Sequence, residues 1–128
     1  MRNVERDAQG STVVEFLAVA VLTVVCLLGV AQLAIWVWAR NVAVTATHEG
    51  ARTAAESGRP LEDGVTRARS LLRDGLGGSA KGFAVEVGQS GVSVAVRAHG
   101  NAPRIMPFLP SFTVDSLATA LDEDFVLP

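Results

Sequence analysis

The longest feature of the hydrophobic pattern is an uncharged run of 24 residues from Phe16 to Ala39. Only Thr23, Gly29 and Gln32 interrupt its apolar side chains. As an α-helix the run rises about 36 Å, which is enough to cross a hydrocarbon core of about 30 Å with some tilt. Because apolar side chains occupy all faces, the pattern predicts a membrane span at about 16–39 rather than a helix lying flat on a membrane.

Two other interpretations of this run compete with a membrane span. A buried core helix is also apolar, but the remaining residues are too few to surround so long a helix on all sides. A cleavable secretory signal has an apolar region of about 7–15 residues followed by a small-x-small site, whereas this run ends in Trp38-Ala39-Arg40. Trp36 and Trp38 fall near that end, where indole rings favour the membrane–water interface. We therefore expect a retained membrane helix.

Beyond the run, the pattern predicts a small α+β domain at 58–128. The first helix, expected over 11–57, continues because 41–56 is rich in Ala and Thr and has no Pro. Gly58 and Pro60 then predict a stop and a restart. An apolar stripe at spacings of three and four predicts a short second helix, with Leu61, Val65, Ala68, Leu72 and Leu76 as its members.

Period-two alternation predicts a small three-stranded antiparallel sheet after the second helix. The alternating segments 83–88 and 92–97 form a predicted hairpin, with its turn at 88–91. Residues 112–121 predict the third strand, with Phe112 and Val114 facing inward.

Two irregular segments flank or interrupt this sheet. The glycine-rich segment 75–82 predicts a flexible break; a dinucleotide-binding loop of similar composition would follow a strand and precede a helix, which is the reverse of the order here. The proline-punctuated loop 103–110 is unusually apolar, with Ile105, Met106, Phe108 and Leu109. Such a loop either covers the core or presents a contact surface, and we expect it to cover the core.

Composition and charge exclude several classes of function. The net charge is −2, and a single Lys among eleven basic residues leaves no broad basic surface for nucleic acid. The only cysteine, Cys26, rules out an internal disulfide and a cysteine-based metal cluster. His48 and His99 lack the neighbours of a metal or nucleophile motif, and the acidic residues 122–124 are expected to be a solvated tail. We expect no enzymatic activity, no cofactor and no metal.

A single carboxylate, Glu15, stands at the head of the apolar run. Burial of a carboxylate in lipid is costly unless it stays in the headgroup zone or finds a partner. Glu15 either marks the membrane edge or belongs to a larger pattern that starts at Gly10. A cut after Gly10 would make Ser11 the new amino terminus and Glu15 its fifth residue.

This pattern resembles the class III signal of type IV pilin-like proteins, which combines a short polar leader, a glycine, a glutamate at mature position five and a long apolar helix. In that family a membrane protease, the prepilin peptidase, removes the leader on the cytoplasmic side. The resemblance implies a leader peptide at 1–10, processing at Gly10 and Ser11, and subunit docking by Glu15, which would neutralise the free amine of a neighbouring subunit.

A second motif narrows the resemblance. Val14-Glu15-Phe16 at the start of the run, followed by Glu49-Gly50-Ala51-Arg52, is similar to the TadE-like family of the Tad (Flp) pilus system. The resemblance implies an α+β, pilin-like fold and a structural minor pilin or pseudopilin that takes part in pilus biogenesis, adhesion or secretion. Glu49, Gly50 and Arg52 are candidates for helix packing or interaction; the alternative, which the small residues around Gly50 favour, is an ordinary helix face against its own domain.

The same resemblance implies the partners and the location. The partners are other pilin or pseudopilin subunits, the prepilin peptidase, the Tad inner-membrane assembly platform and membrane lipid. The chain would cross the cytoplasmic membrane once, with a cytoplasmic amino terminus and an extracytoplasmic domain at 58–128, and would enter an extracellular pilus on assembly. The alternative is a permanently membrane-anchored accessory or scaffold protein of a secretion system that is not incorporated into filaments.

Overall fold

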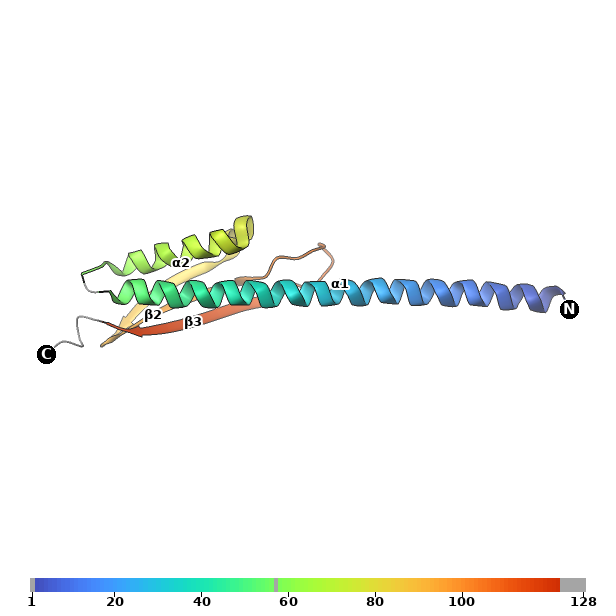
Figure 1. The fold of residues 1–128 in the computed structure, drawn as a ribbon, viewed down its shortest axis with the longest axis horizontal. Helices are drawn as coiled ribbons and strands as arrows, with labels where there is room; N and C mark the ends of the chain where they lie inside the picture. The colour runs from blue at the N-terminus through green and yellow to red at the C-terminus, as the bar shows by residue number, and fades with distance from the viewer. Residues whose placement is uncertain (1, 57, 123–128) are drawn as a thin grey trace. The chain divides into compact units, whose positions relative to one another are not determined.

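The computed structural model describes residues 2–56 and 58–122, with side chains from residue 8 onward. Two helices, α1 (Arg2–Ala55) and α2 (Leu61–Leu76), are followed by the short 3-10 helix η1 (Gly77–Gly82) and by strands β1 (Ala84–Ser90), β2 (Ser93–Asn101) and β3 (Thr113–Leu121) (Figure 1). This confirms the predicted α+β class with a long apolar amino-terminal helix, a short second helix and a three-stranded antiparallel sheet.

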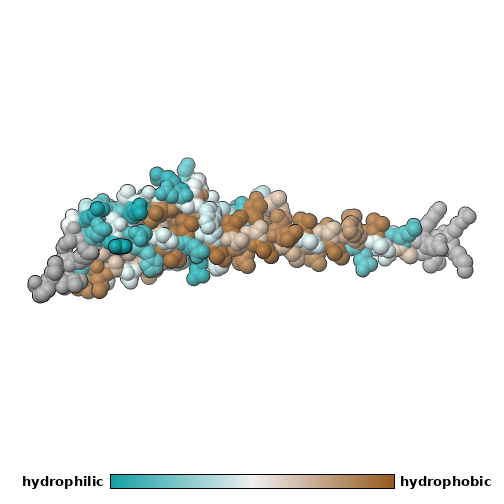
Figure 2. All heavy atoms as spheres, viewed as in Figure 1, coloured by the Kyte–Doolittle hydropathy of each residue, from teal (hydrophilic) through white to brown (hydrophobic). Residues whose placement is uncertain are grey.

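The chain divides into two compact units, a first unit (Met1–Ala34) and a second unit (Ile35–Pro128), and α1 contributes residues to both. In the first unit the large apolar side chains are exposed, with Leu22 at 62% and Leu27 at 64%. Apolar residues follow one another along this part of the helix in Figure 2. Among the described residues, one helix is long and apolar enough to cross a membrane, judged by its length and composition.

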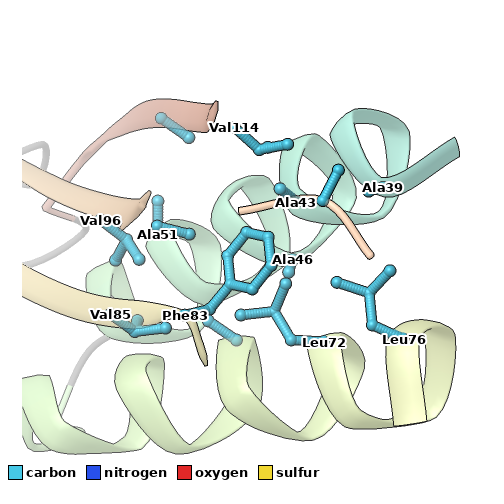
Figure 3. Packing of buried hydrophobic residues seen from close by; sticks show 14 residues of the cluster. Ala39, Ala43, Ala46, Ala51, Leu72, Leu76, Phe83, Val85, Val96 and Val114 are labelled. Carbon is cyan, nitrogen blue, oxygen red and sulfur yellow. The ribbon is translucent and has the colours of Figure 1, made fainter. Parts of the chain in front are cut away.

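The second unit has two layers, with helices covering one face of the sheet. The strands lie in the order β1-β2-β3, and the register pairs Val87 with Val96 and Val96 with Ala118. Since successive side chains of a strand point to opposite faces, this register places the buried apolar residues of all three strands on one face, whereas Leu117 and Leu121 lie exposed on the other. That face packs against α2 and the last part of α1 (Figure 3), and the core includes Ala43, Ala46, Ala68, Leu72, Phe83, Val85, Val96 and Val114.

The contact between α1 and α2 depends on small residues. A Cβ atom added to Gly50 would lie 2.8 Å from the Gly64 carbonyl oxygen, and one added to Gly64 would lie 2.5 Å from the Ala54 Cβ. Both distances are shorter than real Cβ contacts, so glycine at these two positions sets the close separation of the helices. Gly50 also faces Val96 of β2, with its added Cβ 3.4 Å from Val96 Cγ1, so the same turn of α1 contacts both α2 and the sheet.

The connection between the helices follows the predicted stop and restart. Helix α1 ends at Ala55, Gly58 has a φ of +75°, and Pro60 occupies the N-cap position of α2 in extended conformation. Positive φ carries no steric cost for glycine, which lets the chain reverse after a helix. Residue 57, the last residue of the predicted first helix, lies outside the described residues.

The predicted flexible break at 75–82 is wrong, because this segment is helical. Helix α2 continues to Leu76, and η1 follows it directly. Gly75 is needed for packing, since an added Cβ would lie 2.5 Å from Val42 Cγ1 of α1. Gly77, with a φ of +58°, caps α2 by donating its backbone N–H to the Arg73 carbonyl oxygen.

The hairpin turn and the start of the third strand also differ from prediction. Strand β1 extends to Ser90, so the turn consists of Gly91 and Val92 instead of 88–91. Gly91 has a φ of +58° at the first turn position, as two-residue hairpin turns of type II′ require. Phe112 precedes β3 and is 38% exposed instead of facing the core, whereas Val114 is buried as predicted.

The expectation that the apolar loop 103–110 covers the core is wrong for its large side chains. Ile105, Met106 and Phe108 are all exposed. The core is already closed by α1 and α2 on the inner face of the sheet, so these side chains have no cavity to fill. Of the acidic residues 122–124, only Asp122 is described; it accepts a hydrogen bond from Gln89 Nε2 at 2.9 Å.

Candidate functional site

The predicted processing position lies within α1. Gly10 and Ser11 are helical and exposed, and a Cβ atom added to Gly10 would meet nothing within 4 Å. Glycine in a helix interior is about 1 kcal/mol less favourable than alanine. The helix is therefore locally weak at the bond between Gly10 and Ser11, which lowers the cost of unwinding it into the extended form that proteases bind.

The predicted docking residue, Glu15, is also exposed on α1. It stands four residues after Ser11, so the two residues share one face of the helix. Among the described residues, no ion-pair partner accompanies the Glu15 carboxylate. Its neighbours Val14 and Phe16 are 69% and 72% exposed, so the carboxylate lies at the head of an apolar surface without a charge to neutralise it.

The second motif divides between the core and the surface. Gly50 and Ala51 are buried at the contact of α1 with α2 and the sheet, Glu49 is half-buried, and Arg52 is exposed. Within the part of the chain that the structure describes, neither Glu49 nor Arg52 forms an ion pair. Arg52 lies in the last turn of α1, where a cation interacts favourably with the helix dipole.

A cluster around Trp36 joins the end of the apolar run to the sheet. Trp36 Nε1 donates a hydrogen bond to the Thr113 carbonyl oxygen at 3.1 Å, and its ring centroid lies 6.4 Å from that of Phe112. The Arg40 guanidinium lies 5.9 Å from the Trp36 ring centroid. The hydrophobic pattern places Trp36 at the membrane–water interface but carries no signal of its contact with β3, which joins residues 77 positions apart.

The outer face of the sheet carries an exposed ion pair. Arg97 donates from Nε to Asp115 Oδ1 at 3.0 Å and from Nη2 to Asp115 Oδ2, and His99 Nδ1 lies 3.9 Å from the same carboxylate. The hydrogen bond from Arg97 holds the pKa of Asp115 below its usual value, and the same bond raises the pKa of Arg97. Because the pair is exposed, it orders the surface of the sheet more than it stabilises the fold.

An open pocket lies beside α2 and η1. It has a volume of about 620 Å³ and is lined by Arg69, Leu72, Arg73, Gly77, Gly78, Ala80, Lys81 and Phe83. This lining has cations and apolar groups but no carboxylate, hydroxyl, thiol or imidazole side chain, so the Lys81 amine has no acidic or imidazole partner within the lining to activate it. Among the described residues there is also no group of three His, Cys, Asp or Glu side chains that could hold a metal ion.

The decisive comparison concerns the amino-terminal segment that holds these residues. Residues 10–52 match the model of the TadE-like protein family. The TadE-like segment starts at Gly10 and ends at Arg52, so it contains every residue predicted for processing, docking and helix packing. It confirms the resemblance seen in the sequence and indicates a Tad pilus-associated protein of a structural family, with an apolar helix suited to membrane anchoring. No curated protein and no solved structure matches the chain.

Proposed function

We propose that this TadE-like protein is a minor pilin or pseudopilin of a Tad-type pilus. It has no enzymatic role; it waits in the cytoplasmic membrane, anchored by the apolar part of α1, and then joins a filament or its base. The observation that carries the proposal is the exposed Glu15 carboxylate, one helical turn after Ser11 and without an ion-pair partner among the described residues. It lies inside the segment that matches the TadE-like family.

Processing would come first. A prepilin peptidase would cut between Gly10 and Ser11 on the cytoplasmic side and leave a free amine on Ser11. The exposure of both residues and the open space around Gly10 support this step, because a membrane protease must reach the bond from outside the helix.

Docking would follow from the new charge. The ammonium of Ser11 in one subunit and the Glu15 carboxylate of its neighbour would lower each other's cost of burial in an apolar environment, whereas either charge alone is expensive there. The pair would thus fix the register in which apolar helices pack. During assembly the exposed apolar side chains of the first unit would exchange lipid for neighbouring helices, under the action of the Tad assembly platform.

Determining the amino terminus of the full chain, produced in a host with a Tad system, tests the processing step. We expect a mature start at Ser11, and we expect Gly10→Val to block the cut while Gly29→Val, the matched control in the same helix, is processed normally. Intact Met1 in all of the wild-type protein would contradict the proposal.

Incorporation into filaments tests the docking step. Glu15→Ala is expected to be processed but lost from purified pili, whereas Glu62→Ala, which removes a carboxylate from the first turn of α2, should be incorporated like the wild type. Normal incorporation of Glu15→Ala into pili would contradict the proposed pairing of its carboxylate with the Ser11 amine. A wild-type chain that is cut but never found in pili would instead support the permanently anchored accessory protein.

A further inference from the structure

The loop between β2 and β3 is a closed structure that exposes apolar side chains. At its base the Ala102 backbone N–H donates to the Phe112 carbonyl oxygen at 2.9 Å, and within it the Leu109 N–H donates to the Met106 carbonyl oxygen at 3.1 Å. Pro103, Pro107 and Pro110 restrict its backbone. Proline lowers the conformational entropy of the unfolded chain, so these residues reduce the entropy that is lost when the loop becomes ordered.

The exposed side chains of this loop are large and adjacent. Ile105 and Met106 are each 40% exposed, and Phe108, at 73%, is the most exposed large apolar side chain among the described residues of the second unit. Contact of this apolar surface with water is unfavourable, and clustered apolar side chains on a protein surface mark a contact with a partner or a membrane. Arg104, beside them, is exposed as well.

The base of the loop is attached to α1 near the end of the apolar run, and this position favours a membrane as its partner. Its last residue, Phe112, packs against Trp36, and the following Thr113 accepts the Trp36 Nε1 hydrogen bond. Trp36 lies inside the apolar run, three residues before its end at Ala39, which corresponds to about 5 Å along the helix. The base of the loop is therefore attached to the turn of α1 at which the predicted span meets the membrane–water interface, where tryptophan is favoured.

We propose that the loop 102–112 is a second membrane contact, which inserts Ile105, Met106 and Phe108 into the interfacial layer of the bilayer. Arg104 would face the lipid phosphates, as cationic side chains do at the membrane surface. The contact would hold the second unit against the bilayer. This inference rests on the membrane anchoring that is part of the proposed function, and it is independent of cleavage and of incorporation into a pilus.

Site-specific fluorescence on the full chain tests the proposal. The Cys26→Ser background removes the only native cysteine, and single cysteines at Phe108, Leu121 and Leu27 are labelled with a fluorophore whose emission depends on polarity. Leu121 is the matched control, since it is a 64% exposed apolar residue at the far end of β3, about 27 Å along the strand from Thr113. The proteins are reconstituted at one copy per vesicle, in phosphatidylethanolamine and phosphatidylglycerol.

The expected result is a blue-shifted emission for the label at 108, lost on addition of lipids that carry a nitroxide quencher near the headgroup and insensitive to aqueous iodide. The label at 121 should show the opposite behaviour. If 108 behaves like 121, or if its blue shift arises only with several copies per vesicle, the loop contacts water or a second chain and the proposal is overturned. The label at 27, read with lipids that carry the nitroxide on the acyl chain because this residue lies at the middle of the predicted span, separates the two failures: loss of acyl-chain quenching there refutes the anchor itself, whereas loss of headgroup quenching at 108 alone refutes only the loop.

Discussion

The two parts of α1 have the same backbone structure but opposite surfaces. In the first unit, large side chains such as Phe16, Leu22 and Leu27 are more than half exposed. In the second unit, Ala39, Ala43 and Ala46 are completely buried. The first part presents bulk on every side of the helix, whereas the second places small residues on the side that contacts α2 and the sheet.

This difference shows that side-chain size, and not helix propensity, assigns each part of α1 to its surroundings. Small residues let a neighbouring backbone approach, which a packed domain needs. Large apolar residues on all sides of the first unit stay exposed among the described residues, which suits a helix anchored in an apolar environment such as lipid. If this account is correct, a substitution in the second part of α1 should lower the free energy of unfolding of the domain, whereas the matched substitution in the first part should leave it unchanged.

The largest expected contrast is between two leucines. Leu72 is 1% exposed and Leu27 is 64% exposed. Leu72→Ala is expected to lower the free energy of unfolding of the domain by about 2–5 kcal/mol, since it removes buried methyl groups and leaves a cavity. Leu27→Ala should leave it unchanged. Denaturant unfolding of the full chain in detergent, followed by tryptophan fluorescence, measures both; a similar loss in the two variants would contradict the comparison.

Two glycines of α1 provide the next contrast. Gly50→Val should destabilise the domain by about 3 kcal/mol, because the added atoms meet the Gly64 backbone and the helices must separate. A Cβ atom added to Gly29 would meet nothing within 4 Å, so Gly29→Val should not weaken the fold. The same unfolding measurement applies, and a Gly50→Val domain as stable as the wild type would show that the helix separation is not set at this position.

These contrasts indicate how much of the fold can be predicted from sequence. The apolar run at 16–39 and the apolar stripe of α2 can be predicted from sequence, because the spacing of apolar residues indicates whether one face or all faces of a helix are apolar. Contacts between residues that are far apart in the sequence do not appear in this spacing. Local composition alone predicts a flexible break at Gly75, whereas Gly75 lies in α2 with Val42 of α1 packed against it.

The candidate site shows the same division. Gly10, Ser11 and Glu15 could be proposed from the sequence because the pattern that a protease and a neighbouring subunit would recognise is local, and their roles stay predictions. The Trp36 cluster and the exposed loop were missed, since both depend on the pairing of residues 36 and 113. The apolar composition of the loop was visible in the sequence, but whether it faces the core or the outside depends on whether α1 and α2 already close the core.

A smaller effect on domain stability is expected from a threonine in each part of α1, because only the one in the second part bonds to a side chain of the sheet. Thr47 Oγ1 lies 2.8 Å from Ser116 Oγ of β3, and both residues are buried. Thr47→Val would leave the Ser116 hydroxyl without this partner and should cost about 1–2 kcal/mol of domain stability. Thr23→Val, which removes a hydroxyl bonded only to the Val19 carbonyl oxygen within the helix, should cost nothing. In the double variant Thr47→Val/Ser116→Ala, part of the loss should be recovered; no recovery would mean that Thr47 acts through packing alone.

The smallest expected effect concerns the outer face of the sheet in the second unit, which carries the exposed ion pair of Arg97 and Asp115. Arg97 keeps the pKa of Asp115 below its usual value of 3.8. A carboxyl whose pKa is lower in the folded state contributes stability above its unfolded pKa, and that contribution disappears as the pH falls through the folded value. The wild-type melting temperature should therefore fall below about pH 4 more steeply than that of Asp115→Asn. The difference should shrink at high salt because the pair is exposed.

Asp74→Asn is the control, since it removes an exposed carboxylate outside any ion pair of the described residues. This variant should keep the wild-type dependence of melting temperature on pH. A change as large as that of Asp115→Asn would assign the effect to net charge instead of to the pair.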